Sequence, residues 1–220
     1  MNFHSLNTKM MSIILLVVVS YVITLWVLNS QASRMQHDLA TEYAEELAQH
    51  EAFDVKGRLE VAMNASRTLA QALGGLHKIN GNRATADALL REVLDANPAF
   101  LGVWSGWEPN AFDGKDDAYR NAPGHDASGR YVPYWNRGSG KLIVEALVDY
   151  DKPGVGDFYQ LPKANRAETL IEPYLYTVAG KETLITTVVV PIIQNGQCLG
   201  VAGGDIALSD YQNEVSPIHP

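Results

Sequence analysis

The sequence has a single cysteine, and its first 37 residues contain no acidic side chain. One cysteine, Cys198, excludes an internal disulfide. The first acidic residue is Asp38, and Lys9 is the only Lys or Arg before Arg34. The rest of the chain therefore carries 16 of the 17 Lys and Arg residues against 25 Asp and Glu residues. Because phosphate neutralisation dominates nucleic-acid affinity, this acidic balance argues against a nucleic-acid partner.

Charge is also missing from a long N-terminal stretch, residues 10–28. A helix of this length extends about 28 Å, close to the ~30 Å hydrocarbon core of a bilayer. We expect a transmembrane helix over 10–30 that anchors the chain in a membrane as a single pass, with 1–9 on the inner side and 31–220 on the outer side. A cleaved signal peptide with its cleavage site at 30–32 is the alternative, although its apolar region would be unusually long.

Proline is absent from the first 97 residues, whereas ten prolines follow from Pro98 onward. Because proline interrupts helices, this shift predicts a helical N-terminal half and a second half of strands and loops. Apolar and small residues at helical spacing predict a long stalk helix over 31–76 that ends at Gly74-Gly75. The same criterion predicts a second helix over 84–96.

Six short segments rich in β-branched and aromatic residues predict strands. They are 100–107, 129–135, 141–147, 169–178, 183–193 and 198–208. The last two are joined through Asn195-Gly196, the strongest hairpin signal in the chain. Two helices followed by an antiparallel meander predict an α+β lobe over 77–212, with the helices on one face of the sheet. The long loop over 108–128 is expected to be functional or mobile.

No arrangement of residues indicates catalysis, a metal or another cofactor. The six histidines include no i,i+4 pair and no cysteine at metal-ligand spacing. Asp113, Asp116 and Asp117 do not match a calcium-binding loop, and we expect a solvated acidic loop there. A binding protein is therefore expected rather than an enzyme, with a membrane-anchored periplasmic enzyme and an anchored structural protein as the alternatives.

The second half of the chain is rich in Trp and Tyr, which suit both hydrophobic cores and small-molecule pockets. Alternation along a strand places Tyr134 and Asn136 on one face and Trp135 on the other. Tyr174 and Tyr176 likewise share one face of their strand. One such face must enter the core, and a second face rich in Tyr and Asn needs another explanation.

Four blocks of this sequence resemble the double-Cache sensor domain of methyl-accepting chemotaxis receptors. They are GHDASGRYVPYWNRGSG, LVDYDKPGVGDFY, EPYLYTVAGKETLITTVVVPI and LGVAGGDIAL, and the similarity covers about residues 10–220. The same sensor occurs in some sensor kinases and cyclases, so the output module does not follow from the resemblance. The resemblance implies a PAS-like lobe that binds a small molecule and a homodimer formed through the stalk helix. It also implies a truncated chain, in which 213–220 begin a missing membrane-proximal lobe.

The amino-acid-sensing branch of this family holds the ligand carboxylate with an arginine and the ligand ammonium with two aspartates. In this sequence the arginine position falls on Val132 and the first aspartate position falls on Tyr176. The second aspartate is retained as Asp205. The resemblance therefore implies that a free α-amino acid is not the ligand.

The resemblance places the ligand among one carboxylate and several aromatic or amide side chains. These are Tyr134, Trp135, Asn136, Tyr174, Tyr176 and Asp205. Such a set is similar to the purine-sensing branch and implies a flat nitrogen heterocycle as the ligand. An amine held by cation–π contacts and the Asp205 charge is the alternative. A purely structural role for Asp205, capping the turn after its strand, also stays open.

Overall fold

The computed structural model describes residues 3–208, and side chains from residue 9 onward. The chain divides into two compact units, Met1–Lys56 and Gly57–Pro220. Helix α1 (Phe3–Lys78) contributes residues to both units. The expected start of a further lobe at 213–220 lies outside the described residues.

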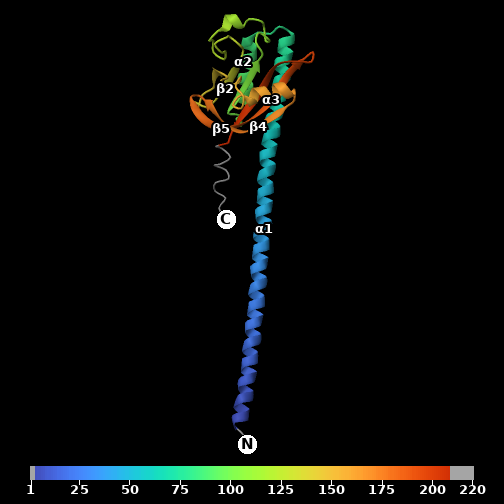
Figure 1. Cartoon of the computed structure of the whole chain (residues 1–220), viewed down its shortest axis with the longest axis vertical. Coiled ribbons are helices and arrows are strands. Elements are labelled where there is room, and N and C mark those ends of the chain that lie inside the picture. Colours follow the sequence, from blue (N-terminus) through green and yellow to red (C-terminus); the bar gives the residue numbers. More distant parts are fainter. Residues whose placement is uncertain (1–2, 209–220) are drawn as a thin grey trace. The chain divides into compact units, whose positions relative to one another are not determined.

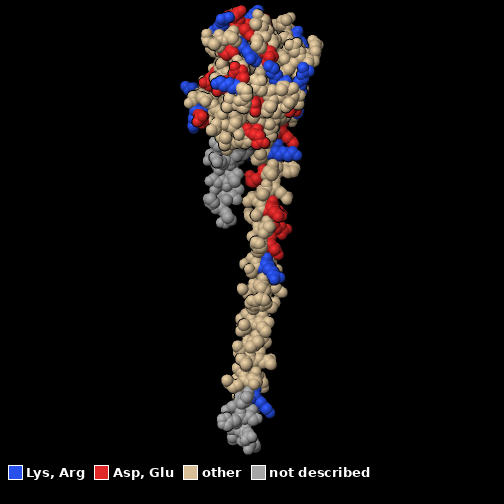
Figure 2. All heavy atoms as spheres, in the orientation of Figure 1, with Lys and Arg blue, Asp and Glu red and all other residues tan. Residues whose placement is uncertain are grey.

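The first unit is helical, and every side chain from 9 to 29 is exposed. Among residues 3–208, one helix, α1, is long and apolar enough to cross a membrane, as judged by its length and composition alone. Figure 2 shows the N-terminal part of the helix without acidic or basic side chains over most of its visible face. Exposed apolar surface of this extent is unfavourable in water, so this segment needs an apolar environment.

Helix α1 does not end at Gly74-Gly75, as the sequence predicted, but continues through both glycines. Gly74 lies against strand β5 (Lys181–Gln194). A Cβ at Gly74 would lie 3.4 Å from the Ile192 side chain, and Gln194 donates a hydrogen bond to the Gly74 carbonyl at 2.7 Å. This close packing on the sheet outweighs the cost of about 1 kcal/mol for each helical glycine.

The turn after α1 and the start of the next helix are set by asparagines. Asn80 has a left-handed φ of 54° at the point where α1 has ended. The predicted second helix is confirmed as α2 (Arg83–Ala96). The Asn82 side chain caps it by accepting a hydrogen bond from the Thr85 backbone N–H at 2.9 Å.

The predicted antiparallel sheet is confirmed, and its six strands have the order β3-β2-β1-β6-β5-β4. Their bounds are β1 Gly102–Trp107, β2 Pro133–Asn136, β3 Ile143–Ala146, β4 Thr169–Val178, β5 Lys181–Gln194 and β6 Gln197–Ala207. The order is not one meander, because β1 pairs with β6 and joins two three-stranded meanders. The predicted hairpin between β5 and β6 is confirmed, with positive φ values of 50° at Asn195 and 75° at Gly196.

Helices cover both faces of the sheet, whereas the sequence predicted helices on one face only. On one face α1 and α2 enclose a core that includes Leu73, Leu90 and Trp107. On the other face lies α3 (Asp157–Asn165), which packs on β4, β5 and β6 and was not predicted (Figure 1). Its nine residues and internal Pro162 gave too little helical pattern to detect.

The long loop after β1 is fixed to α2 by a buried cation and contains a short 3-10 helix, η1 (Asp116–Tyr119). The Arg83 side chain is 2% exposed and forms ion pairs with Asp113 and Asp116, each at 2.6 Å. These two carboxylates are therefore mostly buried, in contrast to the expected solvated acidic loop. Only Asp117 of the three is well exposed, at 88% of its side chain.

Candidate ligand-binding site

Asp205 lies within β6, in the middle of the sheet, on the face that α3 covers. Its register partners are Gly102 of β1 and Thr187 of β5. Residues directly opposite each other on neighbouring strands point to the same face, so Thr187 and Asp205 lie side by side. Asp205 is 2% exposed, and the residues before and after it in the chain both belong to strand β6 rather than to a turn. The structure therefore contradicts the turn-capping role.

Two side chains donate hydrogen bonds to the Asp205 carboxylate. The Trp104 indole N–H reaches Oδ1 at 2.9 Å, and the Thr187 hydroxyl reaches the same oxygen at 2.8 Å. The Tyr134 hydroxyl lies near the carboxylate and is buried, but it forms no well-aligned hydrogen bond with any described residue. Burial raises the pKa of Asp205 to about 6, and these neighbouring groups oppose the rise.

Five aromatic rings surround this carboxylate. Phe158, from the first turn of α3, packs edge-on against Trp104 and Tyr176, with ring centroids 5.3 and 5.5 Å apart. The Phe158 ring also stacks on Tyr174 at 6.1 Å. Tyr134 and Tyr176 are in edge contact at 5.8 Å. The result is a cluster of aromatic side chains closed on the solvent side by α3.

Two glycines allow these rings to lie flat across the strands. A Cβ at Gly102 would lie 2.3 Å from the Tyr134 ring, and a Cβ at Gly203 would lie 2.6 Å from the Trp104 indole. Both distances are impossible for real side chains, so each ring occupies the space that a glycine leaves. The flat placement of Trp104 points its N–H at Asp205.

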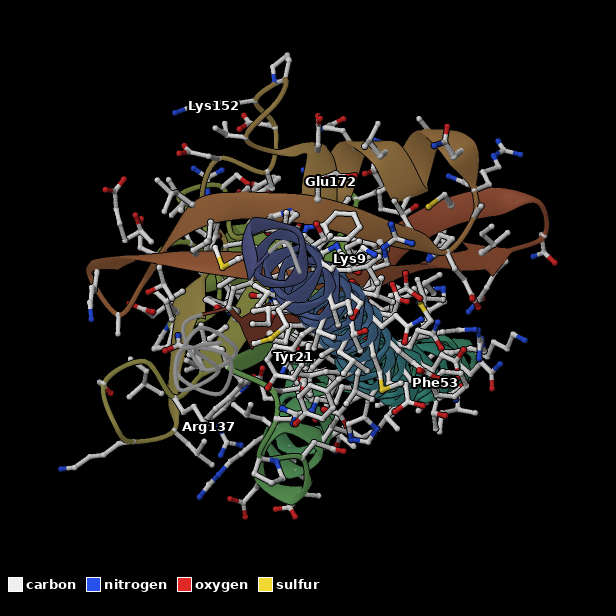
Figure 3. The ribbon with its side chains drawn as sticks, turned by 90° about the horizontal axis from the view of Figure 1, so that it is seen from below. Lys9, Tyr21, Phe53, Arg137, Lys152 and Glu172 are labelled. Atoms are coloured by element: carbon white, nitrogen blue, oxygen red, sulfur yellow. The ribbon has the colours of Figure 1, made fainter. Side chains whose placement is uncertain are left out.

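A β-bulge sets the direction of the two tyrosines on strand β4. The register with β5 shifts between Ile171 and Tyr174, at Glu172 and Pro173 (Glu172 is labelled in Figure 3). The bulge places Tyr174 and Tyr176 on the same face as Ile171, which confirms that the two tyrosines share a face. Proline suits this position because β4 is an edge strand, where an N–H is not required for pairing.

Trp135 is not brought to Asp205. It follows Tyr134 in β2 and points to the opposite face, where it packs against α2. Its indole N–H lies 3.5 Å from an Asp87 carboxylate oxygen, and the Arg91 guanidinium lies 5.9 Å from its ring. The physical reason is strand alternation, which puts neighbouring residues on opposite faces. The structure therefore corrects the placement of Trp135 in the site.

Asn136 shares the face of Tyr134 but lies to one side of the carboxylate. Its register partner is Gly102, whose other partner is Asp205, so two strand spacings, roughly 10 Å, separate Asn136 from Asp205. Its amide Nδ2 donates to Glu145 at 2.8 Å, and its Oδ1 accepts from the Gly138 N–H at 3.2 Å. Both ends of the amide are thus engaged away from Asp205.

The site also contains three residues that sequence reasoning did not find: Trp104, Phe158 and Thr187. Trp104 reaches Asp205 only because β1 pairs with β6, and local patterns carry no information on that pairing. Phe158 depends on α3, which was not predicted. Thr187 did leave a signal, since a polar side chain in the middle of a long apolar strand requires a buried partner.

The fold and the site together define a PAS-like sensor lobe, with a buried aromatic cluster between a sheet and a covering helix. Residues 86–213, more than half of the chain, match the family described as methyl-accepting chemotaxis protein-like, first PDC sensor domain. The chain belongs to this family. The regions of its relatives that this chain matches are sensor domains rather than enzymes.

Individual relatives include both chemoreceptors and kinases. The methyl-accepting chemotaxis protein TlpQ of Pseudomonas aeruginosa is 31% identical over 135 residues, 56% of this chain and 19% of that protein. The extracellular domain of the histidine kinase mmHK1S-Z2 is 38% identical, with a TM-score of 0.72 over 83% of this chain and 66% of that chain. Methyl-accepting chemotaxis protein X is 29% identical, with a TM-score of 0.72 over 84% and 68% of the two chains. The chain thus spans about a fifth of TlpQ and about two thirds of the solved sensor domains.

Proposed function

We propose that this chain is the periplasmic sensor part of a bacterial signal-transduction receptor and that it binds a small nitrogen-bearing molecule at Asp205. One observation carries the proposal: a fully buried carboxylate lies within a cluster of five aromatic rings. Burying a carboxylate is costly unless it is paired, so a site of this kind is suited to a partner that donates hydrogen bonds or carries positive charge.

Between the two ligand classes considered, the geometry supports an amine cation better than a neutral purine-like ring. With a pKa of about 6, Asp205 is mostly ionised at pH 7, by about ten to one. Among the described residues, no Lys, Arg or His is an ion-pair partner of Asp205. Trp and Tyr faces attract cations, and an ammonium beside Asp205 would neutralise its charge. A purine-like heterocycle, which would stack on the rings and donate a ring N–H, is the second candidate.

The proposal includes a membrane anchor and an orientation of the chain across the membrane. Residues 10–30 span the inner membrane as an uncleaved helix, with 1–9 in the cytoplasm and 31–220 in the periplasm. The support is the exposed, uncharged helix that precedes the sensor lobe. The output module is that of a chemotaxis receptor, a kinase or a cyclase, and the similarity to chemoreceptors and to a histidine-kinase sensor domain supports the first two.

We further propose that the receptor is a homodimer through the stalk helix. The part of α1 beyond the proposed membrane segment exposes large apolar side chains along its length. Leu39, Tyr43 and Phe53 are 65%, 67% and 78% exposed, and Phe53 extends away from the helix in Figure 3. A parallel second copy of the same helix would cover these side chains, because equivalent residues would meet across the dimer axis.

A thermal-shift screen on the full chain in detergent micelles tests the ligand class. The panel is 1,4-diaminobutane, choline, adenine, guanine, L-alanine and malate. A compound that binds only the folded protein stabilises it by about 2.7 kcal/mol at a hundredfold excess over its dissociation constant. We expect stabilisation by an amine and none by malate or L-alanine. Stabilisation by adenine or guanine alone would replace the amine with the purine-like ligand.

Calorimetry with the stabilising compound then tests the site. Asp205→Asn removes the charge and should weaken binding tenfold to more than a hundredfold, since a charge-assisted hydrogen bond contributes ~1.5–3 kcal/mol. Tyr176→Asp adds a second carboxylate and should shift preference further towards cations. Asp117→Asn, in the exposed part of the loop, is the matched control and should bind as the parent does. Unchanged affinity in Asp205→Asn would remove Asp205 from the site.

A further inference from the structure

A chain of hydrogen bonds leads from the edge strand of the sheet to Asp205. The hydroxyl oxygens of Tyr174 on β4 and Thr187 on β5 are 2.9 Å apart, and the Thr187 hydroxyl lies 2.8 Å from the Asp205 carboxylate on β6. From the other side, Trp104 on β1 donates to the same carboxylate oxygen. Side-chain hydrogen bonds therefore connect four neighbouring strands, β1, β6, β5 and β4.

The direction of each hydrogen bond follows from the chemistry of its members. An ionised carboxylate only accepts hydrogen bonds, so Thr187 donates its hydroxyl hydrogen to Asp205. A hydroxyl has one hydrogen, so towards Tyr174 the Thr187 oxygen can only accept. Tyr174 is therefore the donor in its contact with Thr187. Each bond in such a series polarises the next, and the whole chain favours negative charge on Asp205.

Thr187 lies where a hydroxyl is unfavourable unless it is hydrogen-bonded. Thr187 is fully buried, and three valines, Val188–Val190, follow it in β5. A valine of nearly the same shape would suit a buried strand, whereas a buried hydroxyl is costly unless it is hydrogen-bonded. The bulge in β4 supplies the second partner, because it turns Tyr174 to the face of Thr187.

We propose that Thr187, assisted by Tyr174, is a positioning residue that fixes the Asp205 carboxylate for its ligand and links the occupied site to edge strand β4. This inference rests on the proposed function, because it takes Asp205 as the ligand contact. A ligand cation that pairs with Asp205 weakens the pull of the carboxylate on the Thr187 hydroxyl. The change passes to Tyr174, so β4 responds to occupancy through this chain of hydrogen bonds.

The test needs no ligand. Trp104 donates its indole N–H to Asp205, so the ¹H–¹⁵N signal of this indole reports the protonation of the carboxylate. The full chain, labelled with ¹⁵N-tryptophan in detergent micelles, is titrated with acid and base, and Trp104→Phe assigns the signal. We expect a midpoint near pH 6 in the parent protein.

Four substitutions test whether the chain of hydrogen bonds from Tyr174 through Thr187 to Asp205, here called the relay, acts on the carboxylate beyond general packing. Thr187→Val removes the hydroxyl at constant shape and should raise the midpoint by about one pH unit, a tenfold change in proton affinity. Thr187→Ser keeps the hydroxyl and should restore the parent midpoint. Tyr174→Phe should move the midpoint in the same direction by a smaller amount. Thr186→Val is the control, because its hydroxyl donates to the Ile171 carbonyl and not to Asp205.

The outcomes are decisive in each case. A parent-like midpoint in Thr187→Val, with the signals of Trp107 and Trp135 unchanged, overturns the relay. If those two signals show that Thr187→Val does not fold, Tyr174→Phe decides the question in its place, and a parent-like midpoint there overturns the relay. Because the titration contains no ligand, its failure leaves the calorimetric result for Asp205→Asn, and with it the proposed function, intact.

Discussion

The indole N–H of Trp104 donates a hydrogen bond to the carboxylate of Asp205 at 2.9 Å, although 101 residues separate the two in the chain. The bond exists because β1 and β6, the first and last strands in sequence, are neighbours in the sheet. Trp104 reaches Asp205 by lying across Gly203, where any side chain would collide with the indole. The site is therefore complete only after the last strand has joined the sheet.

The raised pKa of Asp205 predicts a specific dependence of stability on pH. Its folded-state pKa, about 6, lies above the ordinary value of 3.8, so ionisation costs the folded protein free energy. The stabilising contribution is full below about pH 4 and is lost as the pH rises through about 6. Raising the pKa of one carboxyl from 3.8 to about 6 corresponds to about 3 kcal/mol of folding free energy. In urea unfolding of the full chain in micelles, Asp205→Asn should gain stability relative to the parent between pH 4.5 and pH 7.5.

The comparison with Asp205→Asn isolates this carboxylate from the others. Burial alone would raise the pKa values of Glu108 and Asp113, but hydrogen bonds from Tyr159 and Lys163 to Glu108, and from Arg83 to Asp113, hold both pKa values below their ordinary values. These two carboxylates therefore make the protein less stable in acid. That effect is the same in both proteins and cancels in the difference. Identical pH slopes for parent and variant would show that Asp205 titrates in its ordinary range.

Replacing the two tryptophans on opposite faces of the sheet separates the site from the helical core. Trp104→Phe keeps an aromatic ring but loses the N–H to Asp205, so we expect affinity for a stabilising amine to fall about tenfold or more. Trp135→Phe alters only the face against α2 and should leave affinity unchanged. Isothermal calorimetry on both variants is the measurement. An equal loss of affinity in Trp104→Phe and Trp135→Phe would mean that ligand binding does not depend specifically on the face of the sheet that carries Asp205.

The continuation of α1 through Gly74-Gly75 predicts a stabilising substitution. A Cβ at Gly75 would meet nothing within 4 Å, so Gly75→Ala should raise the free energy of unfolding by about 0.5–1 kcal/mol through helix propensity. Gly129→Ala is the contrasting variant, because its Cβ would lie 1.7 Å from the Asp116 carbonyl at a φ of 84°. In Gly129→Ala the free energy of unfolding should fall by several times the amount that it rises in Gly75→Ala. Urea unfolding checks both, and a destabilised Gly75→Ala would place the helix end at the glycines.

The proposed stalk dimer predicts an effect that depends on the face of α1. Leu39→Lys with Tyr43→Lys puts charge on the exposed apolar stripe and should shift the full chain in micelles from dimer to monomer. Thr41→Lys is the matched control, because its side chain lies about 200° around the helix from Leu39. Analytical ultracentrifugation gives the masses. A parent protein that is monomeric at every concentration would contradict the dimer.

Local patterns in the sequence determined most of the elements. Helix 84–96, strand 169–178 and the Asn195-Gly196 hairpin depend on interactions between near neighbours, so each was predicted with nearly correct bounds. Alternation also predicted that Tyr174 and Tyr176 share a face, and the retained Asp205 was identified from the sequence motif that surrounds it.

Only the tertiary structure decided what surrounds Asp205. The pairing of β1 with β6 brought Trp104 to the carboxylate, and α3 brought Phe158 over it. Packing against β5 likewise allows α1 to continue through Gly74-Gly75, where an isolated helix would be expected to end. These contacts join residues far apart in the chain, and their free energy comes from burial and hydrogen bonding that no local pattern records.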